Sequence, residues 1–156
     1  MMNRDVEAAA AVFRRAIELN PSSHFSRNAL AQALSFVGET DEALAVLAES
    51  ERVDPLYGHD VQWEKARIQW QVGECDAALG TFLSAPSMPV AANKTLAAIH
   101  HCLEDPAKAK EAMATYTTEN PNWTLSRERD VNTGMWTAPG ALDRWLEAME
   151  ASGMPL

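Results

Sequence analysis

The sequence predicts an all-α fold built as a stack of antiparallel helix pairs, on the basis of a recurring pattern, its period and the composition. In the pattern, an alanine is followed four positions later by a bulky apolar residue. The four copies are Ala9 and Phe13, Ala43 and Leu47, Ala78 and Phe82, and Ala109 and Met113. The alanines lie 34, 35 and 31 residues apart, a period typical of stacked supersecondary units rather than of one closed globule. In three copies a proline follows the alanine by twelve residues, at Pro21, Pro55 and Pro121.

The composition agrees with a helical domain and excludes several classes of partner. The chain has 156 residues, is 47% hydrophobic and contains only 7 glycines, so it can bury a sizeable core as one domain, residues 1–156. Its 13 basic and 22 acidic residues give a net charge of −9, which argues against nucleic acid and anionic membrane surfaces as partners. No apolar run is long enough to span a bilayer. Asp5 and Glu7 stand where a signal peptide needs a basic and then an apolar stretch.

The two cysteines indicate a reducing compartment. Cys75 and Cys102 fall in separate predicted units and lack the C-x-x-C spacing. Two cysteines do not make a disulfide framework in a chain of this size. A nucleophilic thiol needs a partner that lowers its pKa, and the sequence shows none. We therefore expect a cytoplasmic protein without a thiol active site.

The first three helices follow from apolar stripes and the breaks between them. A helix over residues 3–19 is predicted by Val6, Ala10, Phe13 and other apolar residues on one stripe. The segment 20–23 ends this helix and caps the next, about 24–37, which stops at Gly38. Thr40 is expected to cap a third helix, 41–53, whose first turn carries two acidic residues as the helix dipole favours.

Four further helices are predicted in the same way. They cover about 59–72, ending at Gly73, then 75–85, 90–103 and 106–119. Asp105 is expected as the N-cap of the last of these, with Pro106 at its first position. Connections of two to four residues force each helix antiparallel to its predecessor, and the pairs then stack.

The first helix of each pair resembles that of the tetratricopeptide repeat (TPR) family, which has a large, a small and another large residue there. The corresponding residues are Leu30-Ala31 with Leu34, Lys65-Ala66 with Gln69, and Leu96-Ala97 with His100. The middle copy departs from the pattern at both large positions. The resemblance implies a right-handed α-solenoid of about three and a half repeats, comprising a half repeat 3–21 and repeats 24–57, 59–89 and 90–121. It also implies binding of a protein or peptide, with no enzymatic activity and no cofactor.

The last segment, 122–156, leaves the repeat pattern. Leu142, Trp145, Leu146 and Met149 form an apolar stripe on a final helix, which we expect to fold back and cap the array. The stretches 121–125 and 151–155 resemble the closing segment of repeat regions appended to bacterial class III nucleotide cyclases. That resemblance implies no activity here, because the sequence contains no cyclase catalytic segment.

Three groups of residues could suggest chemistry, but none has the required spacing. His100, His101 and Cys102 are consecutive, and helical neighbours point about 100° apart, so they cannot converge on one metal ion. His100 is better explained as a buried histidine at a large position of the repeat. His59-Asp60 has no serine in a G-x-S-x-G setting to activate. We expect no catalytic residue, no metal site and no cofactor.

The candidate binding residues lie on the first helices, which line the concave groove in the repeat family. The matching positions are Asn28, Gln32, Ser35, Trp63, Arg67, Trp70, Lys94 and His101. Two tryptophans flanking a guanidinium at i, i+4 and i+7 would suit a peptide with an apolar side chain next to a carboxylate. Alternatively, the C-terminal helix packs on Trp63 and Trp70, and Arg67 pairs with an acidic residue such as Glu147 or Glu150.

Two functions follow from these expectations. The first is a non-enzymatic protein–protein interaction module that binds a peptide or partner domain on its concave face. The alternative is an intramolecular regulatory or dimerising segment of a larger signalling protein such as a nucleotide cyclase, with a homodimer as one arrangement.

Overall fold

The computed structural model describes residues 2–56 and 58–156, and within these ranges all regular structure is helical. The elements are α1 (Met2–Leu19), α2 (His24–Phe36), α3 (Thr40–Val53), α4 (His59–Gln71), α5 (Cys75–Ser84), a short 3₁₀ helix η1 (Val90–Ala92), α6 (Asn93–Cys102), α7 (Pro106–Glu119), α8 (Leu125–Asn132) and α9 (Ala141–Ala151). Tyr57, the last residue of the predicted repeat 24–57, lies outside the described residues. None of the helices in the described ranges combines the length and apolarity needed to cross a bilayer.

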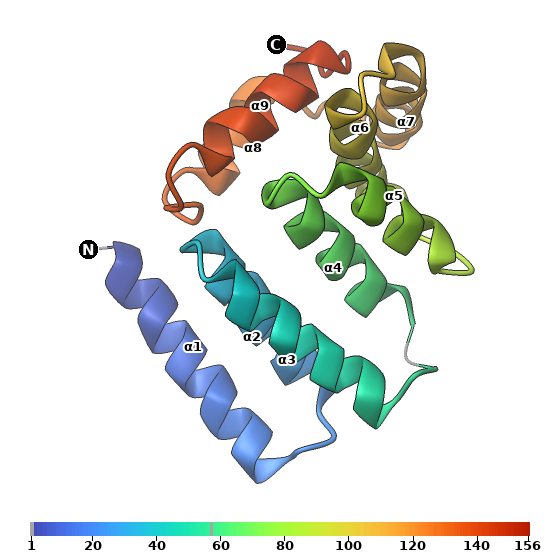
Figure 1. Ribbon diagram of the computed structural model, residues 1–156. Coiled ribbons are helices and arrows are strands. Elements are labelled where there is room, and N and C mark those ends of the chain that lie inside the picture. Colours follow the sequence, from blue (N-terminus) through green and yellow to red (C-terminus); the bar gives the residue numbers. More distant parts are fainter. Residues whose placement is uncertain (1, 57) are drawn as a thin grey trace.

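The helices form an all-α, TPR-like solenoid of antiparallel pairs, as the sequence predicts. Helix α2 pairs with α3, α4 with α5, and α6 with α7, while α1 lies alongside α2 (Figure 1). The recurring alanines Ala43 and Ala78 are fully buried, as are Ala31, Ala66 and Ala97 of the first helices. Alanine at these positions lets neighbouring helices approach closely, so the alanine period corresponds to the helix crossings. In α1 the register differs by one, since Ala10 is buried and Ala9 is partly exposed.

The helix ends follow the predicted capping with one correction. The Ser23 hydroxyl accepts a hydrogen bond from Ser26 N–H (3.2 Å), and the Asp105 carboxylate accepts one from Lys108 N–H (3.1 Å). The prediction of Thr40 as N-cap is wrong, because α3 begins at Thr40 and its N-cap is Glu39. Gly38, in the left-handed region (φ 92°), ends α2 so tightly that Glu39 N–H bonds to Leu34 C=O (2.9 Å). The chain therefore enters α3 one residue early.

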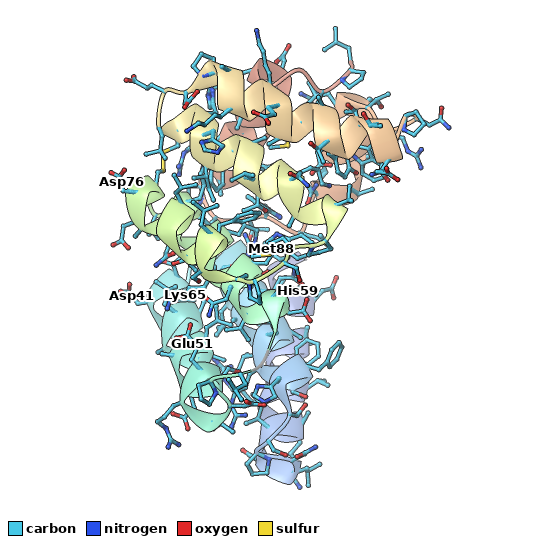
Figure 2. All side chains as sticks on the ribbon, turned by 90° about the vertical axis from the view of Figure 1, so that its right-hand side faces the viewer. Asp41, Glu51, His59, Lys65, Asp76 and Met88 are labelled. Atoms are coloured by element: carbon cyan, nitrogen blue, oxygen red, sulfur yellow. A yellow bond between two sulfur atoms is a disulfide. The ribbon has the colours of Figure 1, made fainter. Side chains whose placement is uncertain are left out.

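At Lys65, one of the two positions where the middle repeat departs from the repeat pattern, an ion pair is formed with the preceding helix pair. The Lys65 ammonium lies 3.0 Å from the Glu51 carboxylate of α3, so the ion pair joins two successive helix pairs (Figure 2). The aliphatic stem of a lysine can cover apolar surface while its charged end reaches a partner. A lysine can thus occupy a position where the family has a large apolar residue.

The C-terminal segment folds back along the first helices of the pairs. Helix α9 packs on α6 and α8, and its residues Trp145, Leu146 and Met149 are buried. The segment is closed on itself by a hydrogen bond from Leu125 N–H to Pro155 C=O (2.6 Å). Its contacts reach back to α2 and α4, so it covers part of the concave side as well as the end of the array.

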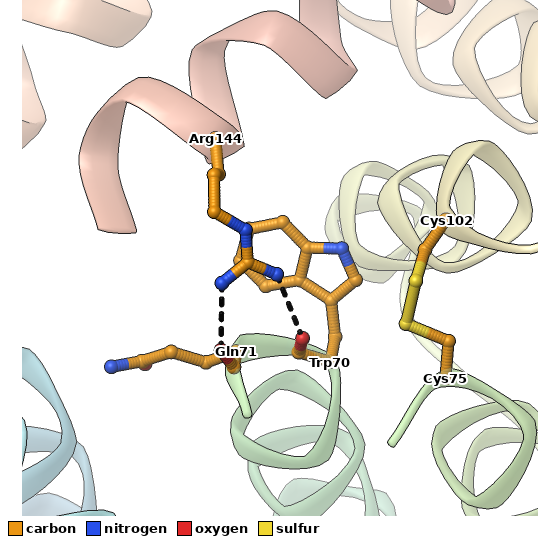
Figure 3. The surroundings of a disulfide bond; sticks show 5 residues. All are labelled: Trp70, Gln71, Cys75, Cys102 and Arg144. Atoms are coloured by element: carbon orange, nitrogen blue, oxygen red, sulfur yellow. Dashed lines mark hydrogen bonds between the residues drawn. A yellow bond between two sulfur atoms is a disulfide. The ribbon is translucent and has the colours of Figure 1, made fainter. Parts of the chain in front are cut away.

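Hydrogen bonds from the C-terminal segment satisfy carbonyl groups at the C-terminal ends of α2 and α4. The backbone N–H groups of Thr137 and Ala138 donate to Phe36 C=O (2.8 and 2.9 Å). The Arg144 guanidinium lies over the Trp70 ring and donates to Gln71 C=O (2.8 Å) and Trp70 C=O (3.3 Å), as Figure 3 shows. The last carbonyls of a helix have no intrahelical partner, and cations are favoured there. These bonds fix the C-terminal segment against the repeats.

The expectation that the cysteines form no disulfide is wrong. Cys75 is the first residue of α5 and Cys102 the last of α6, and a disulfide joins them (Figure 3). Because α5 and α6 run in opposite directions, the start of one and the end of the other meet at the same side of the stack. Their Cα atoms are 6.3 Å apart, within the range that a disulfide requires. Sequence spacing alone does not reveal this proximity.

Candidate binding pocket on the concave face

A pocket of about 390 Å³ lies between the first helices of the three pairs and the C-terminal segment. It is lined by five of the predicted binding residues, which are Asn28, Gln32, Trp63, Arg67 and Lys94. The opposite wall comes from the C-terminal segment and includes Trp123, Glu128, Met135, Trp136 and Trp145. We call this cavity the concave pocket.

The helical repeat of the sequence brings these side chains together. Asn28 and Gln32 are four residues apart on α2, and Trp63 and Arg67 are four apart on α4. Residues with this spacing share one face of a helix. Lys94 opens the first turn of α6, the third of the aligned helices. The i, i+4 spacing on α2 and α4 therefore places these side chains on the helix faces that line the pocket.

Three of the eight predicted residues, Ser35, Trp70 and His101, do not line the concave pocket, and Ser35 is fully buried. Trp70 is buried and contacts Trp145 and Trp136 of the C-terminal segment, with ring centroids 5.4 and 6.4 Å apart. Of the two arrangements that the sequence left open, Trp70 adopts the packed one, whereas Trp63 lines the pocket. His101 lies in the last turn of α6, away from the pocket.

Arg67 is buried, and its charge is balanced within its own helix. Its guanidinium donates two hydrogen bonds to Oε1 of Glu64, one of them from Nε (3.0 Å), and another to the hydroxyl of the buried Ser35. It also lies 4.9 Å from the centroid of the Phe36 ring and 5.2 Å from that of Trp136. The suggested pairing with Glu147 or Glu150 is wrong, because Glu64 is one turn away on α4 and already faces Arg67.

Lys94 is balanced in the same way by Glu128 of α8. Its ammonium lies 2.9 Å from the carboxylate and about 5 Å from the ring centroids of Tyr116 and Trp123. Glu128 is only 1% exposed and also accepts hydrogen bonds from the indoles of Trp123 (2.7 Å) and Trp145 (2.8 Å). Burial, with a further contribution from Glu128, raises the pKa of Tyr116 above its ordinary value.

The C-terminal wall of the pocket is the part that sequence reasoning missed. The sequence pattern puts Trp145 on the capping stripe and Trp123 in the stretch 121–125, but it assigns no binding role to Trp123, Glu128 or Trp136. A signal was present, since three of the chain's 5 tryptophans fall after Pro121. Tryptophan is costly to leave exposed, so such a concentration indicates a segment that packs against another surface.

His100 is a buried histidine, as the sequence indicates. It lies in α6 and is only 8% exposed, and burial lowers its pKa, opposed mainly by the carboxylate of Asp105. Cys102, which the sequence placed beside it, is held in the disulfide. Across residues 2–56 and 58–156, no group of three or more His, Cys, Asp or Glu side chains is arranged to hold a metal ion.

Comparison with known proteins supports the class of protein that the geometry defines, a helical repeat of the TPR type. A tetratricopeptide repeat family model matches residues 12–45, from the second half of α1 into α3. Among solved structures, the chain is similar to one titled "MamA RS-1 ArsTM double mutant", with a TM-score of 0.60, 16% identity, and coverage of 94% of this chain and 84% of that chain. A second, titled "Crystal structure of MamA", gives a TM-score of 0.60 and 14% identity, covering 95% of this chain and 86% of that chain.

These similarities establish the fold rather than a specific activity. At 14–16% identity, the likeness to MamA shows the fold alone. No curated protein matches the sequence significantly. Folds of the TPR type are typically non-catalytic scaffolds that present extended concave surfaces to other proteins. The fold therefore indicates an interaction module with protein partners.

Proposed function

We propose that this chain is a non-enzymatic interaction module that binds a peptide, or an exposed segment of a partner domain, in the concave pocket. The observation that carries the proposal is the cavity of about 390 Å³ that remains between the repeats and the C-terminal segment. Its walls combine aromatic side chains, such as those of Phe36, Trp63 and Trp136, with polar and charged ones. Clefts of about 300–1,000 Å³ in which apolar walls carry convergent polar groups are typical of ligand-binding sites.

A selection of displayed nine-residue random peptides on the immobilised chain tests this proposal. The variant Gln32→Trp fills the pocket, because Gln32 lines it, is exposed and makes no side-chain hydrogen bond among the described residues. The matched control is Ala45→Trp, at an exposed position of α3 outside the pocket. We expect selected peptides to bind wild type and Ala45→Trp equally, and Gln32→Trp at least tenfold more weakly.

Two results would contradict the proposal. One is a selection that enriches no peptide above the level obtained with empty resin. The other is a set of enriched peptides that bind Gln32→Trp as well as they bind wild type, which would place the interaction elsewhere on the molecule.

One observation favours the alternative function, a dimerising or regulatory segment of a larger protein such as a nucleotide cyclase. Helix α1 exposes Val12 (64%) and Leu19 (71%) to solvent, and exposed apolar side chains are candidates for contact with a second copy or another domain. Light scattering of wild type and Val12→Glu tests it. A dimer that dissociates in Val12→Glu would support this function, and a concentration-independent monomer would oppose self-association.

The compartment is the part of the sequence-based interpretation that this proposal changes. The cytoplasmic location was inferred from the expectation of reduced cysteines. A disulfide between Cys75 and Cys102 is more typical of proteins that fold in oxidising surroundings. Alkylation of free thiols in freshly lysed cells, followed by mass spectrometry, would distinguish a reducing from an oxidising compartment, because only a reduced cysteine pair takes up the label.

A further inference from the structure

We infer that the concave pocket selects a cationic side chain, an arginine or a lysine of the bound peptide, rather than the carboxylate that the sequence suggested. This inference rests on the proposed function, and it names the chemistry of the ligand. The pocket is lined by two cations, Arg67 and Lys94, and by three carboxylates, Asp60, Glu64 and Glu128. One negative charge is therefore left over.

Both cations are already engaged by the protein. Arg67 is paired with Glu64 and faces the rings of Phe36 and Trp136, and Lys94 is paired with Glu128 and faces two rings. A peptide carboxylate entering the pocket would have to displace one of these buried pairs. Separating a buried pair is strongly unfavourable, because it leaves a charge in a poorly solvated place.

The hydrogen-bonding capacity left in the pocket is mainly that of acceptors. Oε1 of Glu64 takes both hydrogen bonds from Arg67, and Oε2 has no donor in the described part of the chain, although Glu64 is only 7% exposed. Oδ1 of Asn28 is buried and likewise accepts no hydrogen bond from the described residues. The Asp60 carboxylate is 52% exposed and lies 3.2 Å from Nε2 of the neighbouring His59.

These acceptors lie together at one corner of the pocket, beside an aromatic face. Asp60 and Glu64 are one turn apart on α4, and the Asn28 amide donates to Asp60 C=O (3.4 Å), which places Asn28 against the same turn. Trp63 lines the pocket from the same part of α4. Arginine and lysine combine N–H donors with a positive charge attracted to aromatic faces, so they match this corner in both respects.

The test uses the peptide selection described above and adds three variants that change charge with little effect on packing. Asp60→Asn removes the negative charge that neither Arg67 nor Lys94 balances, and Gln32→Glu adds a further negative charge. Asp76→Asn is the matched control, because Asp76 also occupies the first turn of a helix, α5 (Figure 2), and is not among the residues that line the pocket. The readouts are the residue frequencies of the selected peptides and the fluorescence anisotropy of the best synthetic peptide.

We expect arginine and lysine to be enriched several-fold over the starting library, and aspartate and glutamate to be depleted. The best peptide should bind Asp60→Asn about threefold to fivefold more weakly, as for a partly exposed ion pair. It should bind Gln32→Glu more tightly and Asp76→Asn with unchanged affinity.

The outcomes separate this inference from the proposed function. Enriched peptides that lack cations but are blocked by Gln32→Trp would overturn the inference and leave the pocket as a peptide site. Cationic peptides that bind Gln32→Trp as well as wild type would also overturn it, because they would then be attracted only by the net charge of −9. A selection without any enriched peptide would overturn both.

Discussion

Breaking the Cys75–Cys102 disulfide should cost the protein a large part of its stability. The bridge joins residues 27 apart in sequence and closes a loop that contains α5, η1 and α6. In the chain-entropy relation, cross-linking a loop of this length removes about 12 cal/mol/K from the unfolded state, or about 3.5 kcal/mol at 25 °C. For a domain of this size, about 3.5 kcal/mol corresponds to a fall in the melting temperature of roughly 7–14 °C.

The measurement is thermal unfolding followed by circular dichroism, with and without a phosphine reductant. Wild type should melt at the lower temperature once reduced, while keeping its helical signal at 25 °C, because the apolar contacts of α5 and α6 do not depend on the bridge. The double variant Cys75→Ala with Cys102→Ala is the control. It should melt near the reduced wild type and show no response to reductant.

Two results would refute this account. If reduced and oxidised wild type melt within about 2 °C of each other, the bridge does not restrict the unfolded chain as the relation assumes. If both cysteines of the purified, non-reduced protein react with maleimide, the disulfide does not form in solution.

The remaining predictions concern the buried polar groups and the helix crossings, and thermal melting measures all of them. Arg67→Glu should lower stability by about 3 kcal/mol or more, since it leaves the Glu64 carboxylate beside a like charge; an unchanged melting temperature would mean that Arg67 is not buried. Glu128→Gln should cost a similar amount, because an amide offers one acceptor fewer to four surrounding donors, and a loss below about 1 kcal/mol would contradict this. Ala43→Leu and Ala78→Leu should each cost about 1–3 kcal/mol through overpacking, and variants that melt like wild type would show that helices do not cross there. The pKa of His100 lies below its ordinary value of 6.5, so the unfolded chain binds this proton more readily and stability should fall as the pH drops below 6.5. In His100→Leu the difference in melting temperature between about pH 7.5 and pH 5 should be smaller, and an unchanged difference would assign it to other groups.

The fold could be predicted because its determinants are local and periodic. The alanine at Ala43 and its counterpart at Ala78 mark one position of successive repeats, and each is buried at a helix crossing. Turn signals such as Gly38 and the Asp105–Pro106 cap lie within a few residues of the helix ends that they define. Short-range physical rules therefore suffice for the helices and for the concave face that Asn28, Trp63 and the other first-helix residues share.

The contacts that complete the pocket could not be predicted, because they join residues distant in sequence and follow no period. Arg144 lies more than seventy residues from the α4 carbonyls to which it donates. Trp136 lies in the connection between α8 and α9, where there is no helical periodicity from which to predict the direction of its side chain. The Cys75–Cys102 pair depends on two helix ends meeting in space. In each case the sequence shows a residue type in need of a partner, but the tertiary arrangement determines which partner it finds.

Glu128 connects the stability of the C-terminal segment to the proposed binding site. Its carboxylate accepts hydrogen bonds from Lys94 of the repeats and from Trp123 and Trp145 of the segment. Of these four residues, only Lys94 belongs to the repeats; the other three belong to the wall that the segment forms. A ligand that fits the concave pocket contacts both walls and therefore binds only when the segment is docked. Binding to one state of an equilibrium stabilises that state, by about 2.7 kcal/mol at a ligand concentration of 100 times the Kd. A peptide in the pocket and the buried carboxylate would thus favour the same arrangement, and a change that releases the segment should weaken the apparent affinity in proportion to the fall in the docked fraction.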